Sequence, residues 1–409
     1  MMSDSYAIKA NWTLVGPDLA PVRDATIIVE GGQIADITTR QHPAEFVLGD
    51  VALIPGLVNA HTHLELSDLA QPLEQATPFT TWVRKLIGHR RTRTTSPIEA
   101  MLMGLQESKK AGVVAVGDIL SGQALVEGKF PEAVFQASQG LNAIYFHEVI
   151  GFNTSSFQTA FQQYYLLAEE QSDLRPVLED FTIAVSPHAP YSVHPSLICE
   201  VADRSNFIAM HLAETHSELE FLDRQTGEFR QMLEDFGVWE DGVVAKGSKV
   251  LNYLEMLEGR RRVLVVHGNY LTDEELVYLS EFQHPDRSVM SVVYCPRTHA
   301  YFGHKEHRFR EMLNMGINVC LGTDSRASNP DLSVYEEVKF LKRRYPDMNS
   351  RQLIGMATWR GALALGLESK LGTIEVGKKA KFAVVELGGR EADGIDTRLL
   401  AEGSRARGL

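Results

Sequence analysis

The sequence lacks the features that mark several classes of protein. Its three cysteines, Cys199, Cys295 and Cys320, are far apart and odd in number. This pattern fits reduced thiols in a reducing compartment, and it excludes a Cys-x-x-Cys zinc site because no such pair occurs. No apolar run approaches the roughly 20 residues of a membrane-spanning helix. The opening residues MMSDSYAIKANW lack the charged segment and apolar core of a signal peptide, so we expect a cytoplasmic protein.

Positive charge is also scarce. The formal net charge of −13 leaves no basic footprint for nucleic acid and no polybasic patch for an anionic membrane. The composition is that of an ordinary globular chain, and the length of 409 residues suits one large domain with a smaller companion. We therefore expect a small-molecule substrate as partner, no nucleic acid and no membrane, with a homodimer as the commonest assembly.

Eight short, β-branched apolar runs alternate with longer helical patterns. This alternation predicts parallel strands joined by helices. The runs are GLVNAHTH (56–63), GVVAVGDI (112–119), LNAIYFHEV (141–149), FTIAVSPH (181–188), FIAMHLAE (207–214), RVLVVHGN (262–269), SVVYCPRTH (291–299) and INVCLGTDS (317–325). Eight such units predict an α/β fold, a (β/α)8 or TIM barrel, whose active site lies at the carboxyl ends of the strands.

Segments outside these runs predict a second, smaller domain. ATIIVEGGQIADI alternates around a Gly-Gly turn, and LGTIEVGKKAKFAVVEL (371–387) alternates in the same way. We expect residues 1–55 and 370–409 to form one β-sandwich, which leaves 56–369 as the barrel. The segment 216–260 is too long for a simple crossover, and SELEFLDRQTGEFRQMLEDFGV within it predicts an amphipathic helical stretch. It is either a lid or pocket wall, or an elaborated helix pair.

Histidines and acids end most of the apolar runs. Any one of them could be a core histidine with its hydrogen bonds satisfied. A buried parallel strand, however, should be continuously hydrophobic, so repeated polar groups at the same end indicate a shared site. The residues in question are His61, His63, His147, Glu148, His188, His211, Glu214, His267 and Asp324.

The first two histidines suggest a metal ion. His61 and His63 are two residues apart, and side chains at i and i+2 of a strand point to the same face. With His211 and Asp324 they would offer three imidazoles and a carboxylate, which suits one divalent ion, Zn²⁺ most of all, with Fe²⁺ possible. Such an ion lowers the pKa of a bound water to about 7 and so supplies hydroxide.

Attack of hydroxide on an sp² carbon also requires proton transfer and charge stabilisation. Glu214, three residues after His211, is placed to move protons between water and substrate. His267 could orient the water or polarise the attacked centre, and Asp324 could combine metal contact with proton acceptance. His188, in SPHAPYSV, is either a contact to the substrate ring or leaving group, or a turn histidine held between two prolines.

Several motifs together resemble the amidohydrolase superfamily, in its branch of enzymes that deaminate heterocycles. They are PGLVNAHTH, SPHAPYSVHP, HLAET, VVHGNYLTDEE, CPRTHAYFG, LGTDSRASNP and the closing LGTIEVGKKAKFAVVE. The resemblance implies a distorted barrel, a β-sandwich from both termini and one catalytic metal ion. The fourth run carries no lysine to bridge two metals. By motif, the implied roles are metal ligation for His61, His63, His211 and Asp324, proton shuttling and water activation for Glu214 and His267, and substrate contact for His188.

The segment after the first histidines bears on the substrate. LELSDLAQPLEQATPFTTWVRKL differs from the leucine-arginine-glycine stretch of deaminases that act on S-adenosylhomocysteine and methylthioadenosine. HTHLELS, FTTWV, CPRTHAYFG and GTDSRASNP are more similar to the aminodeoxyfutalosine deaminase group of menaquinone biosynthesis. The substrate of that group, an adenine nucleoside bearing a benzoate, would need a cation for its carboxylate. Arg297 and Arg326, at strand ends, are candidates, unless each simply pairs with a neighbouring acid.

Further residues are candidates for contact with such a substrate. Glu65, just past the first histidines, could bind sugar hydroxyls or cap a turn. Trp82 or Phe79 could stack on a purine, although aromatic residues at such positions are often part of the core. Glu148, at the end of the third run, is the remaining candidate.

Other functions remain open at this stage. The same chemistry serves deamination of S-adenosylhomocysteine, methylthioadenosine, guanine or cytosine, and triazine-type hydrolysis at a C–N or C–halogen bond. Zinc deaminases of flipped bases are excluded, because they use His-x-Glu with Pro-Cys-x-x-Cys, which is absent here. The alternative outside enzymes is a catalytically inactive scaffold on the same barrel. Such a relative should have lost ligands or the proton shuttle, and here every one of these positions is filled.

Overall fold

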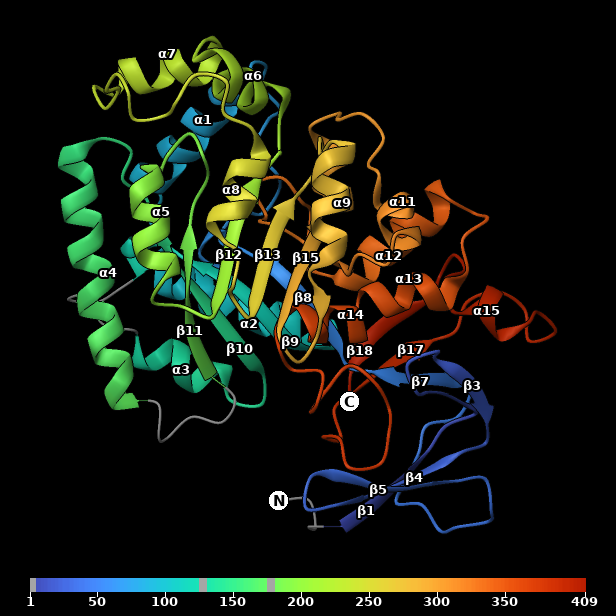
Figure 1. The fold of residues 1–409 in the computed structure, drawn as a ribbon. Helices are drawn as coiled ribbons and strands as arrows, with labels where there is room; N and C mark the ends of the chain where they lie inside the picture. The colour runs from blue at the N-terminus through green and yellow to red at the C-terminus, as the bar shows by residue number, and fades with distance from the viewer. Residues whose placement is uncertain (1–4, 125–130, 175–180) are drawn as a thin grey trace.

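Eight parallel strands form the centre of the molecule (Figure 1). The computed structural model describes residues 5–124, 131–174 and 181–409. The strands are β8 (Leu57–Thr62), β9 (Val113–Leu120), β10 (Asn142–Val149), β11 (Phe181–Pro187), β12 (Phe207–Leu212), β13 (Arg262–His267), β15 (Ser288–Tyr294) and β16 (Val319–Leu321). Each overlaps one of the eight predicted runs, and neighbours pair in parallel, so the predicted barrel is confirmed.

The barrel closes where β16 meets β8. A single bridge joins Thr62 to Asp324, and the N–H groups of Thr323 and Asp324 both donate to the carbonyl of His61 at 3.1 Å. The side chain of Asn59 spans the same seam. Its amide nitrogen donates to Thr323 Oγ1 at 2.8 Å, and its amide oxygen accepts from the N–H of Thr323 at 3.1 Å. Because β16 has only three residues, the seam is irregular and the barrel is distorted.

Helices cover the outside of the barrel (Figure 1). β9 and β10 are buried at every residue between these helices and the barrel interior, which explains their continuous apolar runs. Among the described residues, no helix is long and apolar enough to cross a membrane. The helices are α1 (Phe79–Thr92), α2 (Pro97–Lys110), α3 (Glu132–Ser138), α4 (Thr154–Leu174), α5 (Pro195–Ala202), α8 (Val250–Met256), α9 (Asp273–Glu281), α10 (Pro296–Tyr301), α11 (Phe309–Asn314), α12 (Val334–Arg344), α13 (Ser350–Met356), α14 (Trp359–Ala364) and α15 (Ile395–Arg398).

Strands from both ends of the chain build the second domain. One sheet has the order β5-β4-β1-β6 and the other β18-β17-β7-β2-β3. Buried side chains from both sheets, among them Ile27 and Val384, share one core, so the predicted β-sandwich is confirmed. The domain boundaries at 55/56 and 369/370 stay a prediction. The strands are β1 (Ser5–Lys9), β2 (Trp12–Val15), β3 (Ala20–Arg23), β4 (Thr26–Glu30), β5 (Gln33–Thr38), β6 (Phe46–Val47), β7 (Val51–Pro55), β17 (Phe382–Glu386) and β18 (Arg405–Gly408).

The closing segment contains less strand than its alternation predicts. Only β17 forms within 371–387. The preceding residues form turns along the edge of β5, where Ile34 donates its N–H to the carbonyl of Lys378 and accepts from the N–H of Gly377. Ile374 is buried in the sandwich core. The alternating pattern therefore reflects one-sided burial of turns, which periodicity alone does not separate from a strand.

The long segment between β12 and β13 lies over the carboxyl end of the barrel (Figure 1). Its first half forms two helices, α6 (His216–Arg224) and α7 (Gly227–Asp235), because Gln225 and Gly227 adopt positive φ angles of 57° and 85°. The carboxylate of Glu228 in α7 accepts hydrogen bonds from the N–H and hydroxyl of Thr80 in α1, at 2.8 and 2.9 Å. These contacts attach α7 to α1 at the end of the barrel where the site was predicted.

We expect Asn59→Ala to lower the free energy of unfolding by roughly 2 kcal/mol, because it removes two buried hydrogen bonds to Thr323 at the barrel seam. Urea unfolding followed by circular dichroism measures the change. Asn314→Ala, at an exposed position at the end of α11, is the control. A loss of stability no larger than that of the control would contradict the role of Asn59 in closing the barrel.

Candidate active site

Five imidazole rings meet at the carboxyl end of the barrel. His61 ends β8 and lies 4.9 Å from His63 and 5.0 Å from His211, measured between ring centroids. His188, directly after β11, and His267, at the end of β13, lie 5.0 and 5.4 Å from the His211 ring. The polar residues that end separate apolar runs in the sequence are thus brought together, as expected for a (β/α)8 barrel.

Three of these histidines form a cluster with the geometry of a metal site. His61, His63 and His211 each offer a ring nitrogen within 4.8 Å of the other two. Asp324 adds a carboxylate, whose Oδ1 lies 3.6 Å from Nε2 of both His61 and His63. Nε2 of His61 is buried and has no hydrogen-bond partner among the described residues. This nitrogen is therefore free to bind an ion, and the donor set of three imidazoles and one carboxylate fits Zn²⁺ or Fe²⁺.

Neighbouring groups orient the cluster and keep it in a metal-binding form. Nδ1 of His211 lies 3.1 Å from the carbonyl oxygen of His188, and Oδ2 of Asp324 accepts from the hydroxyl of Ser328 at 3.0 Å. Burial holds the pKa values of His63 and His211 well below the usual value. Burial alone would raise the pKa of Asp324, but contacts with the imidazoles hold it below its usual value. Neutral imidazole and ionised carboxylate are the forms that bind metals.

The chain bends sharply at three points of the site. Ala213, His267 and Asp324 have φ angles of 52°, 69° and 56°, in the left-handed region that costs non-glycine residues about 1–3 kcal/mol each. Tertiary contacts hold these bends. Nε2 of His307 donates to the carbonyl oxygen of His267 at 2.9 Å, for example. The bends carry the chain inward at the ends of β12, β13 and β16, which places the side chains over the barrel.

Glu214 lies beside His267, with 3.5 Å between Oε1 of the glutamate and Nε2 of the histidine. Burial, together with the charges of Asp324 and Glu218, raises the pKa of Glu214 well above its usual value. Burial lowers the pKa of His267 to about 3, so its ring is neutral at neutral pH. A buried carboxyl group that retains protons at higher pH than usual suits proton transfer, which is the role predicted for Glu214.

Glu218, in the first turn of α6, fixes the backbone of Glu214. Its two carboxylate oxygens accept from the N–H groups of Ala213 and Glu214, at 2.9 and 2.8 Å. The side chain of Thr215 in turn accepts from the N–H of Glu218 at 3.1 Å, and Asn269 donates to the carbonyl of Glu214 at 3.0 Å. Glu218 is not among the residues predicted from the sequence, although the Thr-x-x-Glu spacing in HLAETHSE signals a helix start of this kind.

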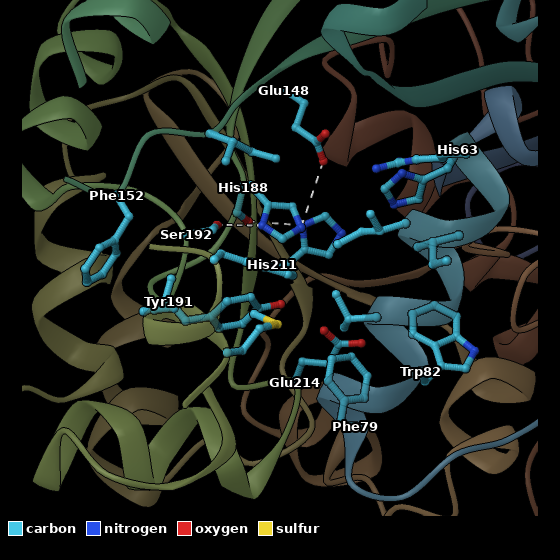
Figure 2. A pocket seen from close by; sticks show the side chains of 18 of the residues that line it. His63, Phe79, Trp82, Glu148, Phe152, His188, Tyr191, Ser192, His211 and Glu214 are labelled. Carbon is cyan, nitrogen blue, oxygen red and sulfur yellow. Dashed lines mark hydrogen bonds and ion pairs between the residues drawn. The ribbon is translucent and has the colours of Figure 1, made fainter. Parts of the chain in front are cut away.

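A cavity of about 340 Å³ opens above the cluster. His63, His211, Glu214, His267 and Asp324 line it at the strand ends. The remaining wall is largely apolar and comes from α1, the loops after β10 and β11, and the segment that contains α7. Figure 2 shows Phe79 and Trp82 on one side of the cavity and Tyr191 and Phe152 on another. Within 216–260, Met232, Leu233, Phe236 and Val238 line the cavity, so α6 and α7 form a helix pair and α7 also contributes to the pocket wall.

Four residues predicted to contact substrate line this cavity, namely His188, Glu148, Trp82 and Phe79. Nδ1 of His188 lies 2.7 Å from the hydroxyl of Ser192, and its Nε2 lies 3.9 Å from Oε1 of Glu148 (Figure 2). Burial raises the pKa of Glu148 to about 7 and lowers the pKa of His188 to about 3. Trp82 also packs in a small apolar cluster, so it belongs to both core and wall.

Arg297 and Arg326 do not line the cavity, which contradicts the prediction that one of them binds a substrate carboxylate. Nε of Arg297 donates to Glu337 at 2.6 Å, and its Nη2 donates to Asp331 at 2.7 Å. Nη1 of Arg326 donates to Glu107 at 2.8 Å, and its other nitrogens donate to backbone carbonyls. Both arginines pair with neighbouring acids, which was the alternative interpretation.

Glu65 requires a similar correction, because its side chain does not line the cavity. Its carboxylate is almost fully buried, forms an ion pair with Arg90 at 2.5 Å and accepts a hydrogen bond from Ser121. Its carbonyl accepts from Arg93 at 2.5 Å. Arg90 itself does line the cavity. The sequence analysis missed Arg90, because the GHRRTR run at the end of α1 has the composition of an ordinary solvent-facing helix end.

The fold and the clustered histidines are those of a (β/α)8-barrel hydrolase whose active site can hold a metal ion. More particularly, the model of the Amidohydrolase family matches residues 52–402, and the chain belongs to this family. The resemblance found in the motifs is therefore confirmed. The protein is an aminohydrolase acting on C–N bonds.

Known relatives cover most of the chain. A 5-methylthioadenosine/S-adenosylhomocysteine deaminase of Pyrococcus furiosus is 26% identical over 379 residues, which cover 88% of this chain and 82% of that protein. An aminodeoxyfutalosine deaminase of Nitratiruptor sp. is 27% identical over 325 residues, 77% of this chain and 75% of that protein. The crystal structure of an adenosine deaminase from Xanthomonas campestris with bound zinc shares the fold, with a TM-score of 0.76, 22% identity and coverage of 98% of this chain and 89% of that one.

We expect Glu218→Gln to lower kcat about tenfold or more while KM and bound metal stay near wild type. A glutamine side chain has one acceptor oxygen, so one of the two N–H groups that hold Glu214 loses its partner, at a cost of about 1–3 kcal/mol. Steady-state kinetics and metal analysis of the purified variant measure this. Glu220→Gln, at an exposed position of the same helix, is the control. Wild-type kcat in Glu218→Gln would show that Glu214 does not need this support.

Proposed function

We propose that this protein is a metal-dependent deaminase of an aminopurine nucleoside. It would replace the amino group on the ring carbon by oxygen from water and release ammonia. The observation that carries this proposal is the cavity itself. A cluster of three histidines and an aspartate, with Glu214 and His267 beside it, faces a space whose remaining wall is mostly apolar. Its polar end suits the reacting ring, and its apolar wall suits a substituent beyond the sugar.

His61, His63, His211 and Asp324 would hold one divalent ion, with Zn²⁺ first and Fe²⁺ second. His61, His63 and His211 form the one cluster of three or more histidines, cysteines or acids with metal-site geometry among residues 5–124, 131–174 and 181–409, which supports a single ion. When bound, the ion supplies Lewis-acid activation of water, whose pKa it lowers to about 7.

The remaining steps are the work of this chain's own side chains. Glu214 accepts a proton from the attacking water and passes it to the substrate, and its raised pKa suits both halves of that exchange. His267, neutral and within 3.5 Å of Glu214, orients the water or polarises the attacked carbon. Asp324 stays ionised and can accept the second proton. His188, fixed by Ser192, contacts the substrate ring.

Among nucleosides we propose aminodeoxyfutalosine first. Its aromatic benzoate would pack on the wall near Phe79, Trp82 and Phe236, with the carboxylate at the mouth in solvent, since neither Arg297 nor Arg326 is in reach. Methylthioadenosine and S-adenosylhomocysteine follow, with support from the names of the relatives. Guanine, cytosine and triazines rank lower, because a single ring system would leave much of the apolar wall uncovered. A cytoplasmic location and a homodimer stay predictions. Cys295 and Cys320 are buried free thiols.

Ammonia release from the zinc-loaded protein tests the proposal across a panel of compounds. The panel holds aminodeoxyfutalosine, methylthioadenosine, S-adenosylhomocysteine, 5′-deoxyadenosine, adenosine, guanine and cytosine. We expect turnover of one or more nucleosides, aminodeoxyfutalosine above all, and little or none of the free bases. Preference for a free base would overturn the nucleoside assignment. Absence of any turnover, together with absence of bound metal, would favour the inactive scaffold.

Substitution separates the proposed shuttle from the proposed ligands. We expect Glu214→Gln to keep its metal and to lose at least about 100-fold in kcat, because general acid–base groups contribute roughly 10²–10⁴-fold. Asp324→Asn should lose metal affinity and activity together. Metal content by mass spectrometry and kcat on the best nucleoside distinguish the two. Near-normal turnover of Glu214→Gln would refute the proton-shuttle assignment, and full metal occupancy of Asp324→Asn would refute its place among the ligands.

A further inference from the structure

Arg90 is a cationic group in the cavity that the proposed chemistry does not use. It lies in the last turns of α1 and lines the cavity together with Glu148 and His188. One of its terminal nitrogens pairs with Glu65 at 2.5 Å, on the side away from the cavity. Its Nε is buried and has no hydrogen-bond partner in the described part of the chain. The Arg90 side chain is 18% exposed and lines the cavity, so a bound molecule can reach its guanidinium.

The position of this guanidinium is fixed from behind. The side chain of Glu65 is only 1% exposed and also accepts from the hydroxyl of Ser121. Nη2 of Arg93 lies 3.8 Å from the same carboxylate, and Nη1 of Arg93 donates to the Glu65 carbonyl. A buried acid with two arginines and a hydroxyl around it holds a rigid geometry. Arg90 is thus a pre-oriented hydrogen-bond donor. Its positive charge is already balanced by the carboxylate of Glu65.

The acceptor that matches Arg90 is Glu148. It is buried at the end of β10 and lines the same cavity, and the positive charge of Arg90 acts on its carboxyl group. Its Oε1 lies 3.9 Å from Nε2 of His188, whose ring lies 5.0 Å from His211 of the metal cluster. Glu148 therefore lies about one ring beyond the cluster. In a purine nucleoside the sugar is likewise separated from the amino-bearing carbon by about the width of the ring system.

The charges decide what this pair binds. Glu65 and Glu148 together balance the charges of Arg90 and Arg93, so no net positive charge is left over for an arriving carboxylate or phosphate. A neutral group that both donates and accepts hydrogen bonds needs no such charge. Two adjacent hydroxyls fit best, since a carboxylate accepts from O–H groups and a guanidinium donates to their oxygens.

We propose that Arg90 and Glu148 bind the vicinal 2′- and 3′-hydroxyls of the substrate's ribose, and so select ribonucleosides over deoxynucleosides. This inference rests on the proposed nucleoside deaminase function and adds the sugar to it. Neither residue takes part in proton transfer, so loss of the contact weakens capture of the sugar more than it slows the reaction at the ring.

The test measures kcat and KM for adenosine and methylthioadenosine and for their 2′-deoxy and 3′-deoxy analogues. With the wild-type protein we expect kcat/KM to fall about 10- to 100-fold when one hydroxyl is removed, mainly through KM, as for hydrogen bonds to charged groups. Glu148→Gln and Arg90→Lys should lose a similar factor on the ribonucleoside. Both variants should also treat ribo- and deoxynucleosides nearly alike, a change that a merely structural defect would not produce.

Arg93→Lys is the matched control, because Arg93 contacts the same Glu65 but does not line the cavity. It should keep the full preference for ribose. Arg90→Lys retains a positive charge beside Glu65, which guards against misfolding. If ribonucleosides turn over but deoxynucleosides react equally well, or if both variants keep the preference, the sugar-binding role is overturned while the deaminase stands. If no nucleoside turns over at all, the proposed function itself fails, and this inference fails with it.

Discussion

The carbonyl oxygen of His61 accepts two backbone hydrogen bonds, from Thr323 and Asp324, and the rest of the site depends on them. These bonds join the first strand of the barrel to the last. They also set the distance between the first histidine of the cluster and its carboxylate, whose Oδ1 lies 3.6 Å from Nε2 of His61. The same hydrogen bonds therefore close the barrel and bring the residues of the cluster together. Asn59 and Thr323, one layer below, keep this seam in register with a pair of side-chain hydrogen bonds.

The surroundings of the cavity shift the pKa values of two carboxyl groups in opposite directions. Asp324 faces the imidazoles, which hold its pKa low despite burial, whereas Glu214 faces Asp324 and Glu218, and burial raises its pKa. One acid is thereby kept ionised and the other is kept able to carry a proton. Environments that separate the pKa values of two acids are how enzymes divide roles between chemically similar groups. Here the division follows from which strand end each acid occupies.

Much of this arrangement could be predicted from the sequence. The eight apolar runs mark the barrel strands, because parallel strands are buried on both faces. His61, His63, His211, Glu214, His267 and Asp324 stand out, because polar groups at the ends of such runs have no packing reason to be there.

The partners of isolated charged residues could not be predicted. Arg297, Arg326 and Glu65 are satisfied by acids or bases distant in sequence, and Arg90 is indistinguishable from its surface neighbours until α1 is placed. Local periodicity likewise could not show that turns, rather than a strand, precede β17.

The apolar wall of the cavity belongs to α1, to α7 with the residues that follow it, and to the loops after β10 and β11, none of which is a barrel strand, while the reacting groups lie at the strand ends. The carboxylate of Glu228 attaches α7 to α1 through Thr80, well outside the cluster. The residues of the apolar wall and the reacting groups therefore lie in separate segments of the chain. Gene duplication followed by exchange or drift of residues 79–92 and 227–238 could give a new substrate range without reassembling the catalytic centre. Directed evolution of this scaffold can start from those two stretches, while Phe152 and Tyr191, after β10 and β11, complete the wall.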